Sequence, residues 1–249
     1  MNKENKGITV IGVDCAVNPK NIGLALGEWK EGRLSVLEVM SADQVACVAQ
    51  KIADWINQGP PKLLAFDAPL GWPQPLGAVL VNHQAGLPIE IEPNQLFRRN
   101  TDRFVKKKVG KQSLDVGADR IARTAHAALK LLSEIRTLTG CNIPLAWDME
   151  LQETSVIEVY PAATLTQYGI RASGYKAKSD QRERREIISH LYSHLFLPEN
   201  TDILEEDADC LDAVVCLLAA RDFLTGQAAA PEPGFLPIVE KEGWIWFRK

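Results

Sequence analysis

The chain has 249 residues, of which 46% are hydrophobic and 24% are charged, and its formal net charge is −4. This composition is typical of a globular protein with a core of good size, and the acidic balance excludes a global basic field that would by itself demand nucleic acid. No stretch approaches the roughly 18–20 apolar residues that a membrane span needs, and Asp14 and Asn18 interrupt the run that follows the N-terminal lysines, so we expect neither a membrane span nor a secretory leader.

The first part of the chain predicts four strands and one helix. Residues 7–16 are apolar nearly throughout, which is typical of a strand buried on both faces. Two more strands are expected at 22–30 and 33–39, joined as a hairpin by a turn at Glu31-Gly32. Ser41 and Gln44 fit the capping box of a helix that ends at Gly59, and a further buried strand follows at 62–67.

The second part begins with an irregular segment, residues 68–115, which is rich in proline and glycine and contains a basic block. Periodicity then predicts a long helix at 116–139, a strand at 155–161, a polar-faced helix at 179–197 and a strongly apolar helix at 206–225. A linker (AAAPEPG) and a last short strand (GWIWFRK) end the chain. This order predicts one α/β domain over residues 1–249 with a mixed sheet, in which 68–115 is a loop-rich insertion near the strand ends.

Four acids interrupt apolar elements and are therefore candidate functional residues. Asp14 ends the first strand, Asp67 ends the fourth, Glu158 lies within SVIEVYPAA, and Asp212 lies in a helix otherwise suited to burial, with Asp209 one turn earlier. In open α/β sheets, ligands gather at the carboxyl ends of the strands. We therefore expect these acids to meet at that edge of the sheet.

A cluster of carboxylates repels itself unless a cation intervenes, and hard oxygen ligands suit Mg²⁺ or Mn²⁺. One or two such ions would suit hydrolysis of a phosphodiester. Each acid also has a structural interpretation that stays open at this point. Asp14 could cap a turn, Asp67 could accept backbone N–H groups of its loop, Glu158 could pair with an arginine, and Asp209 could be an ordinary first-turn helix acid.

Six motifs in this order resemble the family known as domain of unknown function 429: IGVDCA, AFDAPLG, FRRNTDR, IEVYPAA, GYK and DCLDAVVCLLAA. That family is described as predicted nucleases of the ribonuclease-H-like fold. The resemblance implies a mixed sheet with a three-strand meander and parallel strands. It also implies that Asp14 corresponds to the first-strand aspartate of ribonuclease-H-like nucleases, Asp67 to their fourth-strand acid, and Asp212 to the acid on their last core helix. Glu158 falls on an acid of the family's own motif.

The segment 96–111 holds seven basic residues and a single acid, Asp102. Such a local positive patch in an acidic protein predicts contacts with substrate phosphates. Arg98, Arg99 and Arg103 suit bidentate phosphate contacts, and Gly174-Tyr175-Lys176 is a further candidate phosphate contact. The alternative is a solvated flexible loop, which we favour for Lys106, Lys107 and Lys108.

These features predict a cytoplasmic, metal-dependent nuclease or phosphoesterase. The sequence leaves open whether its substrate is DNA, RNA or a small phosphate ester. Two alternatives stand beside it. One is a non-catalytic binding protein, and the other is an ATP-binding relative of actin-like proteins and sugar kinases, although those enzymes carry two copies of the fold.

The five scattered cysteines form no CxxC pair, which favours reduced thiols in a cytosol. His190 and His194 have an i, i+4 spacing but no third ligand, so an exposed helix face is favoured over zinc.

Overall fold

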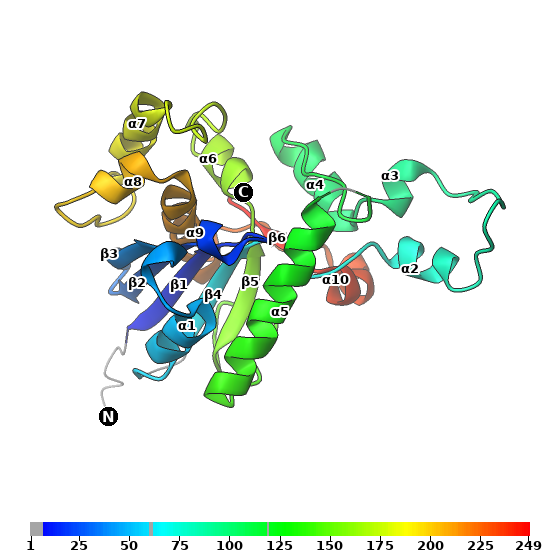
Figure 1. Cartoon of the computed structure of the whole chain (residues 1–249), viewed down its shortest axis with the longest axis horizontal. Coiled ribbons are helices and arrows are strands. Elements are labelled where there is room, and N and C mark those ends of the chain that lie inside the picture. Colours follow the sequence, from blue (N-terminus) through cyan, green and yellow to red (C-terminus); the bar gives the residue numbers. More distant parts are fainter. Residues whose placement is uncertain (1–6, 60–61, 119) are drawn as a thin grey trace.

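The structure is a computed structural model that describes residues 7–59, 62–118 and 120–249. Its centre is a six-stranded sheet in the order β3-β2-β1-β4-β5-β6 (Figure 1). The strands are β1 (Ile8–Asp14), β2 (Gly23–Lys30), β3 (Arg33–Ser41), β4 (Lys62–Asp67), β5 (Ser155–Val159) and β6 (Ile245–Trp246). The pairs β1–β2 and β2–β3 are antiparallel, and the pairs β1–β4, β4–β5 and β5–β6 are parallel. This is the mixed sheet, with a three-strand meander and parallel strands, that the family resemblance implies.

The β2–β3 hairpin turns where the sequence places it. Lys30 pairs with Arg33, and the two residues between them have positive φ, 52° at Glu31 and 79° at Gly32. Two consecutive residues with φ above zero match the right-handed twist of the flanking strands, and glycine takes the second place without a Cβ penalty.

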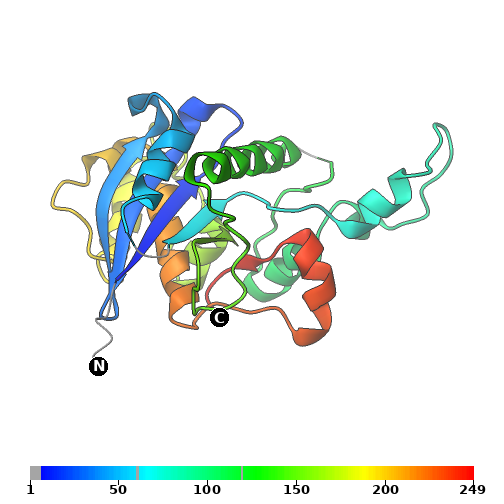
Figure 2. The ribbon, with the colours of Figure 1, turned by 90° about the horizontal axis from the view of Figure 1, so that it is seen from below.

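Helices cover both faces of the sheet (Figure 2). On one face lie α1 (Val48–Ile56) and α5 (Ile121–Thr139), which enclose a core with alternate strand residues such as Ile11, Val13 and Phe66. On the other face lies α9 (Ala208–Leu224), packed on Val10, Leu63 and their neighbours. The outer helices on this side are α6 (Pro161–Gln167), α7 (Gln181–Leu191) and α8 (Asp202–Glu206).

Two glycines let the start of α9 touch the sheet directly. A Cβ at Gly12 of β1 would lie 2.1 Å from the carbonyl oxygen of Ala213, and a Cβ at Gly23 of β2 would lie 2.0 Å from that of Asp209. Any larger residue would push the helix away. This close approach brings the second turn of α9 against the end of β1.

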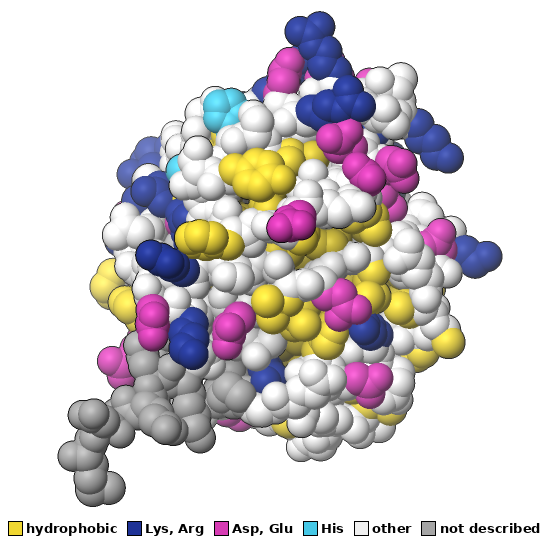
Figure 3. Space-filling view, turned by 90° about the vertical axis from the view of Figure 1, so that its left-hand side faces the viewer, with side chains coloured by type: hydrophobic (Ala, Val, Ile, Leu, Met, Phe, Trp, Pro, Cys, Tyr) yellow, Lys and Arg dark blue, Asp and Glu magenta, His cyan; other side chains and the backbone are white. Residues whose placement is uncertain are grey.

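Part of the outer edge of β3 is covered by hydrogen bonds to the segment around Phe196. The amide of Val36 donates to the carbonyl of Phe196 at 2.8 Å, and the amide of Phe196 donates to the carbonyl of Leu34 at 2.9 Å. The side of the molecule that carries β3 shows hydrophobic patches separated by scattered charges, and both basic and acidic side chains gather at the end where α7 lies (Figure 3).

The segment 68–115 contains more regular structure than the sequence suggests. It forms three helices, α2 (Gln74–Leu80), α3 (Pro93–Leu96) and α4 (Asn100–Val109), and its first two helices project away from the sheet (Figure 1). The expectation that this segment is irregular is therefore wrong. Short helices that begin at Pro-containing turns have too few periodic positions to be detected from the sequence. No residue between 74 and 95 is buried.

Several boundaries also differ from the predicted ones. The capping box at Ser41 is wrong, because Ser41 ends β3 and makes no side-chain cap, and after a 3₁₀ turn (η2, Ala42–Gln44) the helix begins only at Val48. The apolar helix predicted at 206–225 runs from Ala208 to Leu224, because the carboxylate of Asp207 caps α9 by accepting the amides of Asp209 at 2.8 Å and Cys210 at 3.2 Å. The other predicted helices begin later or end earlier than expected, as at Ile121 for α5.

The remaining elements are two 3₁₀ turns, η1 (Pro19–Asn21) and η3 (Pro233–Phe235), and the C-terminal helix α10 (Leu236–Glu242). No helix in the described part of the chain is long and apolar enough to cross a membrane. The five cysteines are all free thiols.

Candidate metal centre

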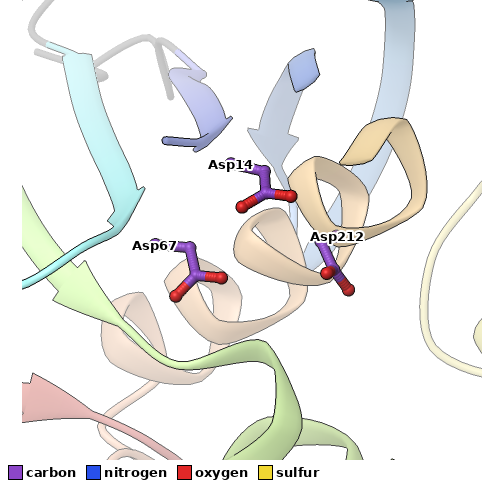
Figure 4. Close-up of side chains that lie close together, drawn as sticks. All are labelled: Asp14, Asp67 and Asp212. Atoms are coloured by element: carbon purple, nitrogen blue, oxygen red, sulfur yellow. The ribbon is translucent and has the colours of Figure 1, made fainter. Parts of the chain in front are cut away.

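Three aspartates from three elements converge at the carboxyl ends of β1 and β4 (Figure 4). Asp14 and Asp67 are the last residues of these strands and are direct neighbours in the parallel register. Asp212 comes from the second turn of α9. One carboxylate oxygen of each lies within 4.8 Å of the others, and this is the one group of three or more His, Cys, Asp or Glu side chains that could hold a metal among the described residues.

The three side chains are withdrawn from water. Asp14 is 8% exposed, Asp212 is fully buried and Asp67 is half-buried. Burial raises the pKa of Asp14 well above its usual range, and the carboxylates of Asp67 and Asp209 raise it further against the opposing charge of Lys176. Burial also raises the pKa of Asp67 from 3.8 to about 6. The fold therefore holds these acids in a place where negative charge is disfavoured without a cation.

Lys176 supplies the positive charge that reaches this cluster. Its ammonium group pairs with Oδ2 of Asp212 and lies 3.9 Å from Oδ2 of Asp14, while about half of the side chain, 55%, remains exposed. The neighbouring Tyr175 donates its hydroxyl to Oδ1 of Asp212 at 2.8 Å, and burial raises the pKa of this phenol, which keeps it a donor. Gly174, with φ of 70°, makes the turn that presents both residues.

The sequence predicts Tyr175 only as part of a candidate phosphate contact, and not as a residue that holds Asp212. Tyr175 lies within the GYK motif, between a turn glycine and a lysine, and that position is the signal that could have identified it. Asp212 is thus held on both oxygens by this one loop.

Glu158 lies near the cluster but faces a different partner. Both of its oxygens accept from Arg99, at 2.6 and 2.7 Å, and Oε2 also accepts the amide of Leu70 at 3.0 Å. Arg99 makes further bonds to both oxygens of Asp102 and to the carbonyl of Glu242. The structure therefore places Glu158 in an ion pair and not among the three converging carboxylates.

Arg99 is 1% exposed, and its guanidinium donors are all engaged in this network. Although burial opposes it, the carboxylates of Asp102 and Glu158 raise the pKa of Arg99. No N–H group of this arginine remains for a substrate phosphate, in contrast to the expectation from the sequence.

The other two arginines of the basic segment also bind neighbouring groups. Arg98 pairs with Asp115 and donates to Oδ1 of Asn94 at 2.6 Å. Arg103 donates to the carbonyls of Arg98 and Asn94 at 2.6 and 3.0 Å and to the side chain of Asn100 at 2.8 Å. Both arginines stabilise the base of the projecting segment.

Asp209 lies in the first turn of α9, close enough to Asp14 for their carboxyl groups to influence each other's pKa. It is half-buried and stands outside the group of three. The histidine pair forms no metal group either, and the ring of His194 instead lies 4.5 Å from that of Tyr168.

A cavity of about 260 Å³ adjoins the aspartates. Asp14 and Asp67 line one part of it, and the Arg99–Asp102–Glu158 network lines another. The residues present fit a divalent cation, because the converging carboxylates offer hard oxygen ligands and their burial favours neutralisation by a positive charge.

Comparison with known proteins adds two findings. A family model described as "Protein of unknown function (DUF429)" matches residues 12–234. Among solved structures, the chain is similar to T. thermophilus RuvC in complex with Holliday junction substrate, with a TM-score of 0.37 and 11% sequence identity, over 88% of this chain and 96% of that chain. No curated protein matches the chain.

Proposed function

The chain belongs to the DUF429 family of proteins of unknown function, and for it we propose the activity of a metal-dependent phosphodiester hydrolase. The observation that carries this proposal is the convergence of Asp14, Asp67 and Asp212, with one oxygen of each within 4.8 Å of the others. The single ammonium of Lys176 offsets only part of the charge of three gathered carboxylates, and a bound cation would offset the remainder.

Asp14, Asp67 and Asp212 would hold Mg²⁺ or Mn²⁺, as one ion or two. Such ions supply an activated water and stabilise the leaving oxygen of a phosphodiester. Tyr175 and Lys176 fix the orientation of Asp212 from one loop. The exposed ammonium of Lys176 is placed to bind a phosphate oxygen of the substrate beside the carboxylates.

We infer the substrate class from the cations of the segment 96–111. Lys111 donates to the carbonyl of Ala172 at 3.5 Å, so the basic segment that ends there lies beside the loop that carries Lys176. Lys107 and Lys108 at the end of α4 are exposed and form no ion pair with any described residue. These lysines can contact the phosphates of a nucleic acid, which we propose as the substrate in preference to a small phosphate ester.

The test is cleavage of labelled single-stranded DNA, duplex DNA and RNA with Mn²⁺ or Mg²⁺, together with hydrolysis of bis(p-nitrophenyl) phosphate as a small diester. Asp14→Asn is expected to abolish both activities, while Asp54→Asn, which changes an exposed acid on α1, leaves them unchanged. Full activity in Asp14→Asn, or the absence of every metal-dependent activity in the wild type, would contradict the proposal.

A further inference from the structure

The cavity beside Asp14 and Asp67 has a second wall that the proposed reaction does not use. This wall is apolar and is formed by the chain around the start of α5 and the ends of β5 and β6: Leu114, Val116, Ile121, Val159 and Ile245. Tyr160 and Thr124 are its polar members, and no described residue hydrogen-bonds their hydroxyl groups. The cavity thus joins the carboxylates to a surface suited to a flat, mostly apolar group with polar edges.

The part of the cavity away from the proposed metal centre offers no free positive charge to a phosphate. Asp14, Asp67, Asp102 and Glu158 all line it, and the guanidinium of Arg99 is fully occupied by two of these carboxylates and a backbone carbonyl. Beside Asp102 and Glu158, an anion would therefore meet acids without a free donor of positive charge. A neutral group that offers N–H donors would instead find acceptors.

The size of the cavity limits what can enter. Its volume of about 260 Å³ corresponds to roughly nine water molecules at ~30 Å³ each. This is enough for one nucleobase. Tyr160 offers an aromatic ring and a hydroxyl group, which suit stacking and hydrogen bonding to a base.

We propose that this cavity binds a single unstacked nucleobase of the substrate strand, next to the phosphate at Asp14, Asp67 and Asp212. The inference rests on the proposed function and deepens it. Because a paired base cannot reach such a cavity without leaving its stack, the enzyme would act on single strands, ends or distorted sites and disfavour intact duplex.

The experiment narrows the cavity without touching the carboxylates. Leu114 lies at the cavity rim and is 41% exposed, so Leu114→Trp adds bulk there at little risk to the fold. The matched control is Leu138→Trp, which changes a similarly exposed leucine near the other end of α5. Binding of a fluorescein-labelled single-stranded 12-nucleotide DNA is measured by anisotropy, with Ca²⁺ in place of Mn²⁺ to prevent cleavage. We expect Leu114→Trp to weaken binding roughly ten-fold, the loss associated with one stacked base, and Leu138→Trp to leave it unchanged.

A second measurement assigns the effect to a base. One abasic residue is moved position by position through the same oligonucleotide. In the wild type, one position is expected to weaken binding roughly ten-fold, and in Leu114→Trp that position should no longer matter, because the two changes remove the same contact. Equal losses in both proteins, or no sensitive position in the wild type, would overturn the inference.

Bis(p-nitrophenyl) phosphate separates this inference from the proposed function, since it carries no base. Leu114→Trp should hydrolyse it at the wild-type rate and bind Mn²⁺ with the wild-type affinity. If hydrolysis of this small diester falls together with DNA binding, the cavity is part of the reaction centre and holds no base. A wild type that binds no Mn²⁺ and hydrolyses no diester would contradict the proposed function itself.

Discussion

Replacing Asp67 with asparagine should stabilise the metal-free protein, although it removes a residue of the proposed metal centre. Burial and the neighbouring carboxylates make the charged form of Asp67 unfavourable in the folded state, and the pKa rises from 3.8 to about 6. Asparagine is close in size and carries no charge. The variant therefore removes an electrostatic cost that only the folded state bears.

The magnitude follows from the pKa difference between the unfolded and folded states. Because the folded pKa is the higher one, the cost is absent below the unfolded value near 3.8, grows as pH rises, and is complete above the folded value near 6. A shift of about 2 units corresponds to about 3 kcal/mol at pH 8, and the same relation leaves less than about 1 kcal/mol at pH 4. The gain in stability from Asp67→Asn should therefore be large at pH 8 and small at pH 4.

The assay is urea unfolding of both proteins in the presence of a chelator at pH 4, 6 and 8. Asp54→Asn is the control for loss of an acid at an exposed position. Added Mn²⁺ should reverse the order at pH 8, because the ion stabilises only the protein that binds it. A metal-free Asp67→Asn variant that is less stable than the wild type at pH 8, or whose effect is independent of pH, would refute this reasoning.

Three further predictions concern the same site and its surroundings. Mn²⁺ affinity should fall as pH decreases from 8 to 5, because Asp14 and Asp67 take up protons that compete with the ion; a pH-independent dissociation constant in calorimetry would contradict this. Arg99→Met should lower the free energy of unfolding by about 3–5 kcal/mol, because it leaves Glu158 charged and buried without its partner. A variant that is as stable as the wild type but binds DNA more weakly would show that Arg99 contacts a phosphate after all. Lys176→Gln should weaken DNA binding and lower the slope of log affinity against log salt by about one, without weakening Mn²⁺ binding; an unchanged slope would limit Lys176 to a contact with Asp212.

The sequence identifies the strands and the acids at their ends because both signals are local. Apolar runs that end in Asp14 and Asp67 predict buried strands with a carboxylate at the tip, and parallel pairing then brings the two together. Asp212 is detectable because it interrupts an apolar helix. The three-residue group among the described residues consists of these acids.

Contacts between distant segments could not be predicted in the same way. The sequence raises an arginine as a partner of Glu158, which the structure confirms, but nothing local identifies it as Arg99, 59 positions away. The carboxylate of Glu242 binds the amides of Gln74 and Asn100 at 2.8 and 2.7 Å, which ties both ends of the projecting segment to α10. Such partners become evident only when the topology is known, so a basic motif that suggests phosphate binding can instead neutralise a buried acid.

The most direct test of the proposed metal centre is a calorimetric titration with Mn²⁺ at pH 8, on the wild type and on the double variant Asp14→Asn, Asp67→Asn. The account predicts saturable binding to the wild type and none to the double variant, which should remain folded and be at least as stable as the wild type without metal. Equal binding by both proteins would show that the ion is held elsewhere, and a wild type that binds no Mn²⁺ would contradict the metal centre.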